Sequence, residues 1–341
     1  MRRSDTFSAI LLVLMWSSGF VGAELGTRFA PADTLLGWRY VVATVLLVTW
    51  VVLRGVRPDR HTWPRLALVG LLCQCLYLGG VVTGVGMGVP AGTAALVAAL
   101  QPLVVAVGSG PLLGDPTSRR QRVGLGLGVV GVALVVSSDL GAGAAGLLAY
   151  ALVVGGMLAL SAGTLLERRM RLPVPLIESL TVQTLTAAVF FVAVAAVDGH
   201  LAPPAEPGFW WSVAWVVGLS TFGGYGSYLL VLRRSGATRV STLLFLTPPV
   251  TALWAFAMFG TRPGLLAIPG AAVCALSVWL VMRRQRSSSL GHRPRRDRQP
   301  PDDEERPDAG RGGRPPAVLV GEPDQRAKGA GAEVVGQQIH R

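Results

Sequence analysis

Two charged side chains, Arg39 and Glu24, stand inside or at the end of long apolar stretches of this 341-residue sequence. An arginine at the bilayer centre costs about 2.5 to 3.5 kcal/mol on insertion scales, and such residues usually face a cavity or a partner. A pair of Arg39 and Glu24 would bind a substrate carboxylate or carry a coupling proton. Alternatively, Arg39 lies only ~8 Å into its stretch, so its head could extend to the outer membrane interface.

Two prolines, Pro102 and Pro248, lie in the middle of other apolar stretches. Proline lacks an amide donor, so it frees the carbonyl four residues earlier, here that of Ala98 or Leu244. Freed carbonyls can line a cavity at membrane depth, so both sites are predicted helix kinks. The alternative is random tolerance, since proline is commoner in membrane helices than in soluble ones.

Several polar and aromatic side chains in the apolar stretches could face a substrate, although each alone also suits an interface anchor or a helix contact. They include Gln183, Tyr228 and Trp254, whereas Glu178 is expected to be hydrated. The predicted substrate-binding set is Arg39, Glu24, Trp16, Gln74, Tyr77, Gln101, Tyr225 and Thr247.

Other chemistries lack their residues. The histidines His61, His200, His292 and His340 lie outside the apolar stretches, and Lys328 is the single lysine. Haem ligation, a histidine proton relay and a Walker phosphate loop are therefore disfavoured. Cys73, Cys75 and Cys274 fall inside apolar stretches and suit neither a disulfide scaffold nor a zinc ribbon. We expect no catalytic residue, metal or cofactor.

The elements that position these residues are predicted membrane helices. The chain is 51% hydrophobic and 15% charged, with a mean hydropathy of +0.51, whereas a soluble domain is about 25% charged. Runs of roughly 18 or more apolar residues can cross a ~30 Å hydrocarbon core. Ten spans are predicted, at 7–24, 34–53, 66–85, 91–112, 122–138, 146–166, 177–197, 209–232, 238–259 and 264–283.

The arginines set the orientation of these spans. With alternate loops assigned to opposite sides, eighteen arginines fall on one side, and only Arg28 and Arg262 fall on the other. Basic loops mark the cytoplasmic side, so both termini are predicted to be cytoplasmic. The net charge of +12 therefore reflects topology and not a nucleic-acid partner.

The segment 287–341 differs from the rest, because proline, glycine, arginine and acidic residues dominate it. Such a composition cannot bury enough apolar surface to offset its ordering entropy. We predict a disordered cytoplasmic tail.

The remaining chain contains an internal repeat. An offset of 146 aligns Leu100-Gln101-Pro102 with Leu246-Thr247-Pro248, and Gly124 with Gly270. The predicted repeats, 7–138 and 146–283, hold five spans each, so the second enters the membrane from the opposite side. Inverted repeats around a midplane cavity are a recurring transporter design. Chance alignment of glycine- and leucine-rich helices is the alternative.

An ordered set of short motifs carries a family resemblance. They are Trp16-Ser17-Ser18-Gly19-Phe20, Arg39, Gly92-Thr93-Ala94, Leu100-Gln101-Pro102, Leu113-Gly114-Asp115, Val240-Ser241 and Leu246-Thr247-Pro248. The chain resembles the EamA family of the drug/metabolite transporter superfamily over about 7–283. Members often end the fourth and ninth spans with Gly-Glu. Here Gly114-Asp115 and Gly260-Thr261 stand there, so a role for the second acidic position does not carry over.

The resemblance implies a ten-helix secondary carrier built from two five-helix inverted repeats. We therefore expect an all-α integral membrane protein of a bacterial inner membrane that exports a small metabolite, such as an amino acid. Its partners are the lipid bilayer and a small-molecule substrate; proton coupling and a homodimer are both compatible with the sequence. The alternatives are an integral-membrane enzyme acting on a lipid-linked substrate and a membrane scaffold or sensor.

Overall fold

The computed structural model describes residues 3–55, 60–114, 118–141, 145–235, 237–261, 264, 266 and 268–277. Every regular element among them is a helix, as predicted. The first part contains α1 (Arg3–Gly26), α2 (Ala32–Leu53), α3 (Trp63–Gly70), the π-helical segment η1 (Leu71–Leu76), α4 (Tyr77–Gly86), α5 (Ala91–Ala98), α6 (Gln101–Leu113) and α7 (Arg119–Gly141). The second contains α8 (Leu147–Met170), α9 (Leu176–Val197), α10 (Pro207–Trp215), the π-helical segment η2 (Val216–Gly224), α11 (Tyr225–Ser235), α12 (Ala237–Leu244), α13 (Thr247–Phe259) and a further helix, Ile268–Ser277.

Eight helical stretches are long and apolar enough to cross a membrane. They are Thr6–Gly26, Ala32–Leu53, Trp63–Gly86, Ala91–Leu113, Arg119–Leu140, Leu147–Met170, Leu176–Val197 and Pro207–Arg234. These match the first eight predicted spans. The ninth predicted span is interrupted, and the tenth is described as a helix only over Ile268–Ser277. The predicted tail, 287–341, lies outside the described residues.

Two predicted spans are each divided into two helices at a proline. The span 91–112 consists of α5 and α6, and 238–259 consists of α12 and α13. Proline at the second position of α6 and of α13 has no amide to continue the preceding helix. Both second helices end at a glycine with a left-handed backbone, Gly114 at φ 74° and Gly260 at φ 70°.

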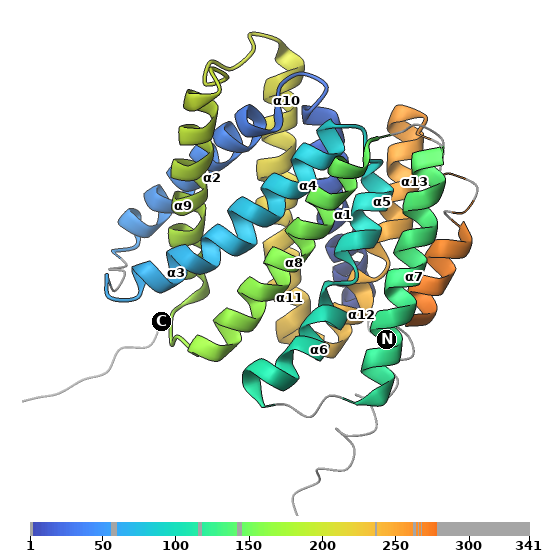
Figure 1. The fold of residues 1–341 in the computed structure, drawn as a ribbon. Helices are drawn as coiled ribbons and strands as arrows, with labels where there is room; N and C mark the ends of the chain where they lie inside the picture. Colours follow the sequence, from blue (N-terminus) through green and yellow to red (C-terminus); the bar gives the residue numbers. More distant parts are fainter. Residues whose placement is uncertain are drawn as a thin grey trace, which may run out of the picture. The chain divides into compact units, whose positions relative to one another are not determined.

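The helices of the two parts are interleaved. Helix α1 packs against η2 and α13, whereas α8 packs against η1, α4 and α6 (Figure 1). Helices α2 and α9 pack along each other. Glycines allow the closest approaches, because a Cβ atom at Gly84 would lie 2.8 Å from the Ala149 carbonyl oxygen, and one at Gly156 would lie 2.8 Å from that of Tyr77.

Helix α7 packs against the helix Ile268–Ser277 in an antiparallel register. A Cβ atom at Gly131 would lie 2.8 Å from the Gly270 carbonyl oxygen, and one at Gly270 would lie 2.8 Å from that of Gly131. The Ser277 hydroxyl donates a hydrogen bond to the Gly124 carbonyl. The 146-residue offset therefore exchanges these contacts, since Gly124 corresponds to Gly270 and Gly131 to Ser277.

Candidate functional site

A cavity of about 70 Å³ lies where the two helix breaks meet. Helices α1, α5 and α13 pack together around it (Figure 1). The lining residues are Trp16, Phe20, Tyr77, Ala95, Ala98, Ala99, Gln101, Pro102, Leu160, Leu244, Phe245 and Thr247. Four residues of the predicted substrate-binding set, Trp16, Tyr77, Gln101 and Thr247, therefore share one cavity. Ala98 and Leu244, whose carbonyls lose their usual donors to proline, line it as well.

Some polar groups at the two helix breaks have hydrogen-bond partners, and one does not. The Gln101 side-chain amide donates to the Thr164 hydroxyl at 3.1 Å. The carbonyl of Thr247 accepts a hydrogen bond from the Ser17 hydroxyl at 3.4 Å. The hydroxyl of Thr247 is buried and has no hydrogen-bond partner among the described residues. This hydroxyl remains available to a ligand.

A second polar cluster surrounds Gln74 in η1. The Tyr40 hydroxyl donates to the Gln74 side-chain carbonyl at 2.7 Å. The Gln74 amide donates to the Tyr225 hydroxyl at 3.0 Å and lies 3.4 Å from the Gln183 side-chain oxygen. The predicted residues Gln74 and Tyr225 are thus joined, and Gln74 bridges both parts of the chain.

Arg39 is buried beside this cluster, with 6% of its surface exposed. Its Nη2 donates to the Thr221 hydroxyl at 3.2 Å, and its Cζ lies 5.5 Å from the centre of the Tyr40 ring. Its Nε is buried and has no hydrogen-bond partner among the described residues. Within the described part of the chain, no carboxylate forms an ion pair with it. The guanidinium head therefore lies inside the helix bundle.

Glu24 does not pair with Arg39, contrary to the hypothesis of an Arg39 and Glu24 pair. Its Oε1 lies 3.4 Å from Nη2 of Arg28 and accepts a hydrogen bond from the Thr261 hydroxyl at 3.0 Å. Arg28 lies four residues further along the chain, in the turn that follows α1, and this short separation lets the two side chains meet. The other oxygen, Oε2, is buried without a partner in the described residues.

Ring contacts show which of the remaining candidate substrate-binding residues lie near the cavity. The Trp16 ring centre lies 6.1 Å from that of Tyr225 and 5.9 Å from that of Tyr228, so these three rings cluster beside the cavity. Trp254 instead packs on Trp215, with ring centres 5.5 Å apart. Glu178, expected to be hydrated, is instead buried, with 5% of its surface exposed.

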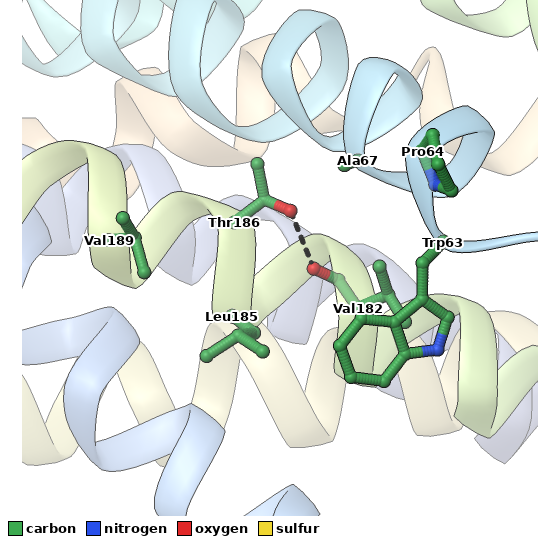
Figure 2. Close-up of a pocket in the computed structure, with 7 residues that line it drawn as sticks. All are labelled: Trp63, Pro64, Ala67, Val182, Leu185, Thr186 and Val189. Atoms are coloured by element: carbon green, nitrogen blue, oxygen red, sulfur yellow. Dashed lines mark hydrogen bonds between the residues drawn. The ribbon is translucent and has the colours of Figure 1, made fainter. Parts of the chain in front are cut away.

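A larger groove of about 330 Å³ lies between α3 and α9, away from these residues. Figure 2 shows its lining residues, Trp63, Pro64, Ala67, Val182, Leu185, Thr186 and Val189. The single hydroxyl among them, that of Thr186, donates to the Val182 carbonyl at 2.8 Å. A groove lined mainly by apolar side chains suits lipid chains better than a polar metabolite.

Sequence reasoning missed three partners of the site, Tyr40, Thr221 and Thr164. Tyr40 directly follows Arg39, which is the one local signal for it. Thr221 and Thr164 are ordinary helix residues by sequence, and only the packing of η2 and α8 brings them to Arg39 and Gln101.

Comparisons with known proteins agree on one class. Residues 5–137 and 147–283 match the EamA-like transporter family. An uncharacterized inner membrane transporter of Escherichia coli K12, YedA, is 25% identical over 71% of this chain and 78% of its own length. A probable amino-acid metabolite efflux pump of the same strain is 24% identical over 73% of this chain and 85% of its own length.

Two further likenesses cover more of the chain. A probable terminal-alkyne amino-acid exporter of Streptantibioticus cattleyicolor is 29% identical over 84% of this chain and 95% of its own length. One protein of known crystal structure superposes with a TM-score of 0.56 at 19% identity, covering 84% of this chain and 99% of its own. That superposition shows a shared fold.

Proposed function

Since this chain belongs to the EamA-like transporter family, which matches both of its parts, we propose that it exports a small metabolite by alternating access. It is a multi-pass membrane transporter. The proposed substrate is an amino acid or a related compound, moved against its gradient by secondary coupling, with protons as the coupling ion. Relatives named as amino-acid efflux pumps and exporters support this class of substrate.

We propose that residues 7–138 and 146–283 are two inverted repeats of five spans each. The matching breaks after α5 and α12, and the matching glycine ends of α6 and α13, support this. So do the exchanged contacts between α7 and the helix Ile268–Ser277. Rocking of one repeat against the other would then open the central cavity to alternate sides.

The central cavity is the observation that carries the proposal. It lies between the two helix breaks, and both parts of the chain contribute to its wall. Substrate and coupling-ion sites of inverted-repeat carriers lie near the midplane at such broken helices. Trp16, Tyr77, Gln101 and Thr247 are the proposed contacts there, with Pro102 and Pro248 as the kinks.

Arg39 is the proposed partner of a substrate carboxylate. It is a buried cation without a carboxylate partner in the described residues, and Gln74 and Tyr225 lie in the adjoining cluster. An arginine fork is well matched to a carboxylate. Glu24, held by Arg28 and Thr261, is proposed as a contact nearer the outer end of α1.

Metabolite profiling tests this function. Cells that overproduce the chain should accumulate one or more amino acids or related compounds in the medium while the cytoplasmic pool falls. In everted vesicles, an imposed proton gradient should drive uptake of the same compound. Removing 287–341 should leave this flux unchanged. Unchanged profiles, with no gradient-driven flux of any amino acid, would refute the proposal.

A further inference from the structure

The two helix breaks give the central cavity an excess of hydrogen-bond acceptors. The carbonyls of Ala98 and Leu244 lose the amide four residues later, because Pro102 and Pro248 have none. Both residues line the cavity, one from each part of the chain. Each part of the chain therefore places one residue with a freed carbonyl in the wall of this space of about 70 Å³.

Donors at the same breaks are scarce. Pro102, Pro248 and Pro249 contribute no amide at the start of α6 and α13. The next amides, those of Leu103, Val104 and Val250, donate to the carbonyls of Leu100 and Leu246. The Gln101 side-chain amide donates to Thr164. Proline therefore leaves both helix starts with fewer amides than usual, which makes them weaker anion sites than an ordinary helix start.

The buried hydroxyl of Thr247 adds a separate observation. Thr247 lines the cavity and is 3% exposed, yet its hydroxyl has no partner among the described residues. Leaving such a buried hydroxyl unpaired destabilises the folded protein. A ligand that donates a hydrogen bond to this oxygen would remove that cost.

The remaining wall suits a positive charge. Trp16 and Tyr77 line the cavity, and none of its lining residues is charged. Aromatic faces attract organic cations, more strongly where water is excluded. The volume equals roughly two waters of ~30 Å³, which fits a head group rather than a whole metabolite.

We infer that this cavity binds a primary ammonium group, held by the carbonyls of Ala98 and Leu244, the hydroxyl of Thr247 and the aromatic rings. The inference rests on the proposed function, in which the ammonium belongs to an exported amino acid and Arg39 takes its carboxylate. The Trp16 ring in the cavity wall lies 6.1 Å from that of Tyr225. Gln74 joins Tyr225 to Tyr40, which lies beside Arg39, so the cavity adjoins the proposed carboxylate site.

Three probes of one carbon skeleton test the site on the purified full-length protein in lipid nanodiscs. Isopentylamine carries only the ammonium, 4-methylpentanoate only the carboxylate, and L-leucine both. Ligand-dependent shifts in melting temperature give an apparent affinity for each. We expect isopentylamine and L-leucine to bind. Absence of an isopentylamine shift, or tighter binding of 4-methylpentanoate than of isopentylamine, would overturn the inference.

Substitutions locate the binding. Thr247→Val removes the hydroxyl at constant shape and should weaken isopentylamine binding about tenfold, whereas Thr247→Ser should retain it. Thr251→Val is the matched control, since its hydroxyl is also buried and unpartnered but its residue does not line the cavity. Pro102→Ala and Pro248→Ala restore an amide that can satisfy the freed carbonyl and should weaken binding too. Pro111→Ala, further along α6, should not.

These outcomes separate the ammonium site from the transport function. Amine binding that Thr247→Val, Pro102→Ala and Pro248→Ala all leave unchanged would place the ammonium elsewhere and overturn the site. Amine binding with the expected variant pattern, but no flux of any metabolite, would leave the site standing and refute the proposed function. Flux that requires a carboxylate on the substrate but does not depend on its amine would support the proposed function and overturn the ammonium site.

Discussion

Burying the Arg39 guanidinium inside a membrane bundle carries a cost that its visible contacts only partly offset. The head has one side-chain hydrogen bond, to Thr221, and lies near the Tyr40 ring, while its Nε has no partner in the described residues. A buried charge without an opposite charge is expensive. A substrate carboxylate would supply the missing partner during transport.

Replacing Arg39 should therefore impair recognition of the carboxylate. We expect Arg39→Ala to raise the KM for export of a carboxylated substrate by roughly tenfold or more, since a hydrogen bond to a charged group contributes about 1.5–3 kcal/mol. Flux in everted vesicles measures this. Arg54→Ala, an exposed arginine directly after α2, is the matched control and should have no effect. Wild-type transport by Arg39→Ala, in correctly inserted protein, would end this assignment.

A second buried charge, Asp139, has a structural partner. Its Oδ2 accepts a hydrogen bond from the Thr93 hydroxyl at 2.7 Å, and 4% of its surface is exposed. Thr93→Val should lower the free energy of unfolding by about 1–3 kcal/mol, because it leaves a buried carboxyl oxygen without this donor. Thermal denaturation in detergent measures the loss. Thr186→Val, whose hydroxyl donates only within its own helix, should cost clearly less, and an equal loss would contradict the prediction.

Four of the residues predicted to bind substrate line one cavity, whereas the predicted pairing of Arg39 with Glu24 was wrong. Trp16, Tyr77, Gln101 and Thr247 share the cavity because they lie on spans that converge on the breaks. Glu24 pairs with Arg28, four residues away, and not with the predicted Arg39, because the nearer arginine is held close by the chain. Tyr40, Thr221 and Thr164 depend on side-chain packing between distant helices, which no local pattern encodes.

Among the elements, proline made the breaks predictable, whereas the π-helical segments had no comparable signal. Pro102 and Pro248 remove an amide, so the divisions between α5 and α6 and between α12 and α13 follow from covalent chemistry. Segments η1 and η2 instead place Gln74 and Thr221 through a widened backbone. Such segments often occur at functional sites, and local packing decides them.

The contact between α4 and α8 depends on small residues. A Cβ atom at Gly156 would lie 2.8 Å from the Tyr77 carbonyl oxygen, whereas the adjacent Gly155 has open space. Gly156→Leu should therefore destabilise the protein by about 1–3 kcal/mol through overpacking. The melting temperature in detergent reports this. Gly155→Leu on the same helix should leave it nearly unchanged, and equal effects of the two substitutions would contradict the close approach.

At the scale of the whole molecule, the arginine distribution was the most informative property of the sequence. It predicts on which side of the membrane each loop lies, and the helix boundaries show where each loop begins and ends. Eight predicted spans match apolar helices of sufficient length. The ninth predicted span is divided at its proline into α12 and α13, just as the fourth is divided into α5 and α6.

Cysteine labelling at the two ends of α9 tests the proposed orientation with minimal change to the protein. Pro173 precedes this helix and Ala202 follows it, and both are exposed, so a cysteine at either position can react. In a background with Cys73, Cys75 and Cys274 replaced, Ala202→Cys should react with an impermeant maleimide on intact cells. Pro173→Cys should react only after permeabilisation, because Arg168, Arg169 and Arg171 hold that end in the cytoplasm. The opposite pattern would contradict the predicted topology, and labelling of both positions from outside would mean that α9 does not span the membrane.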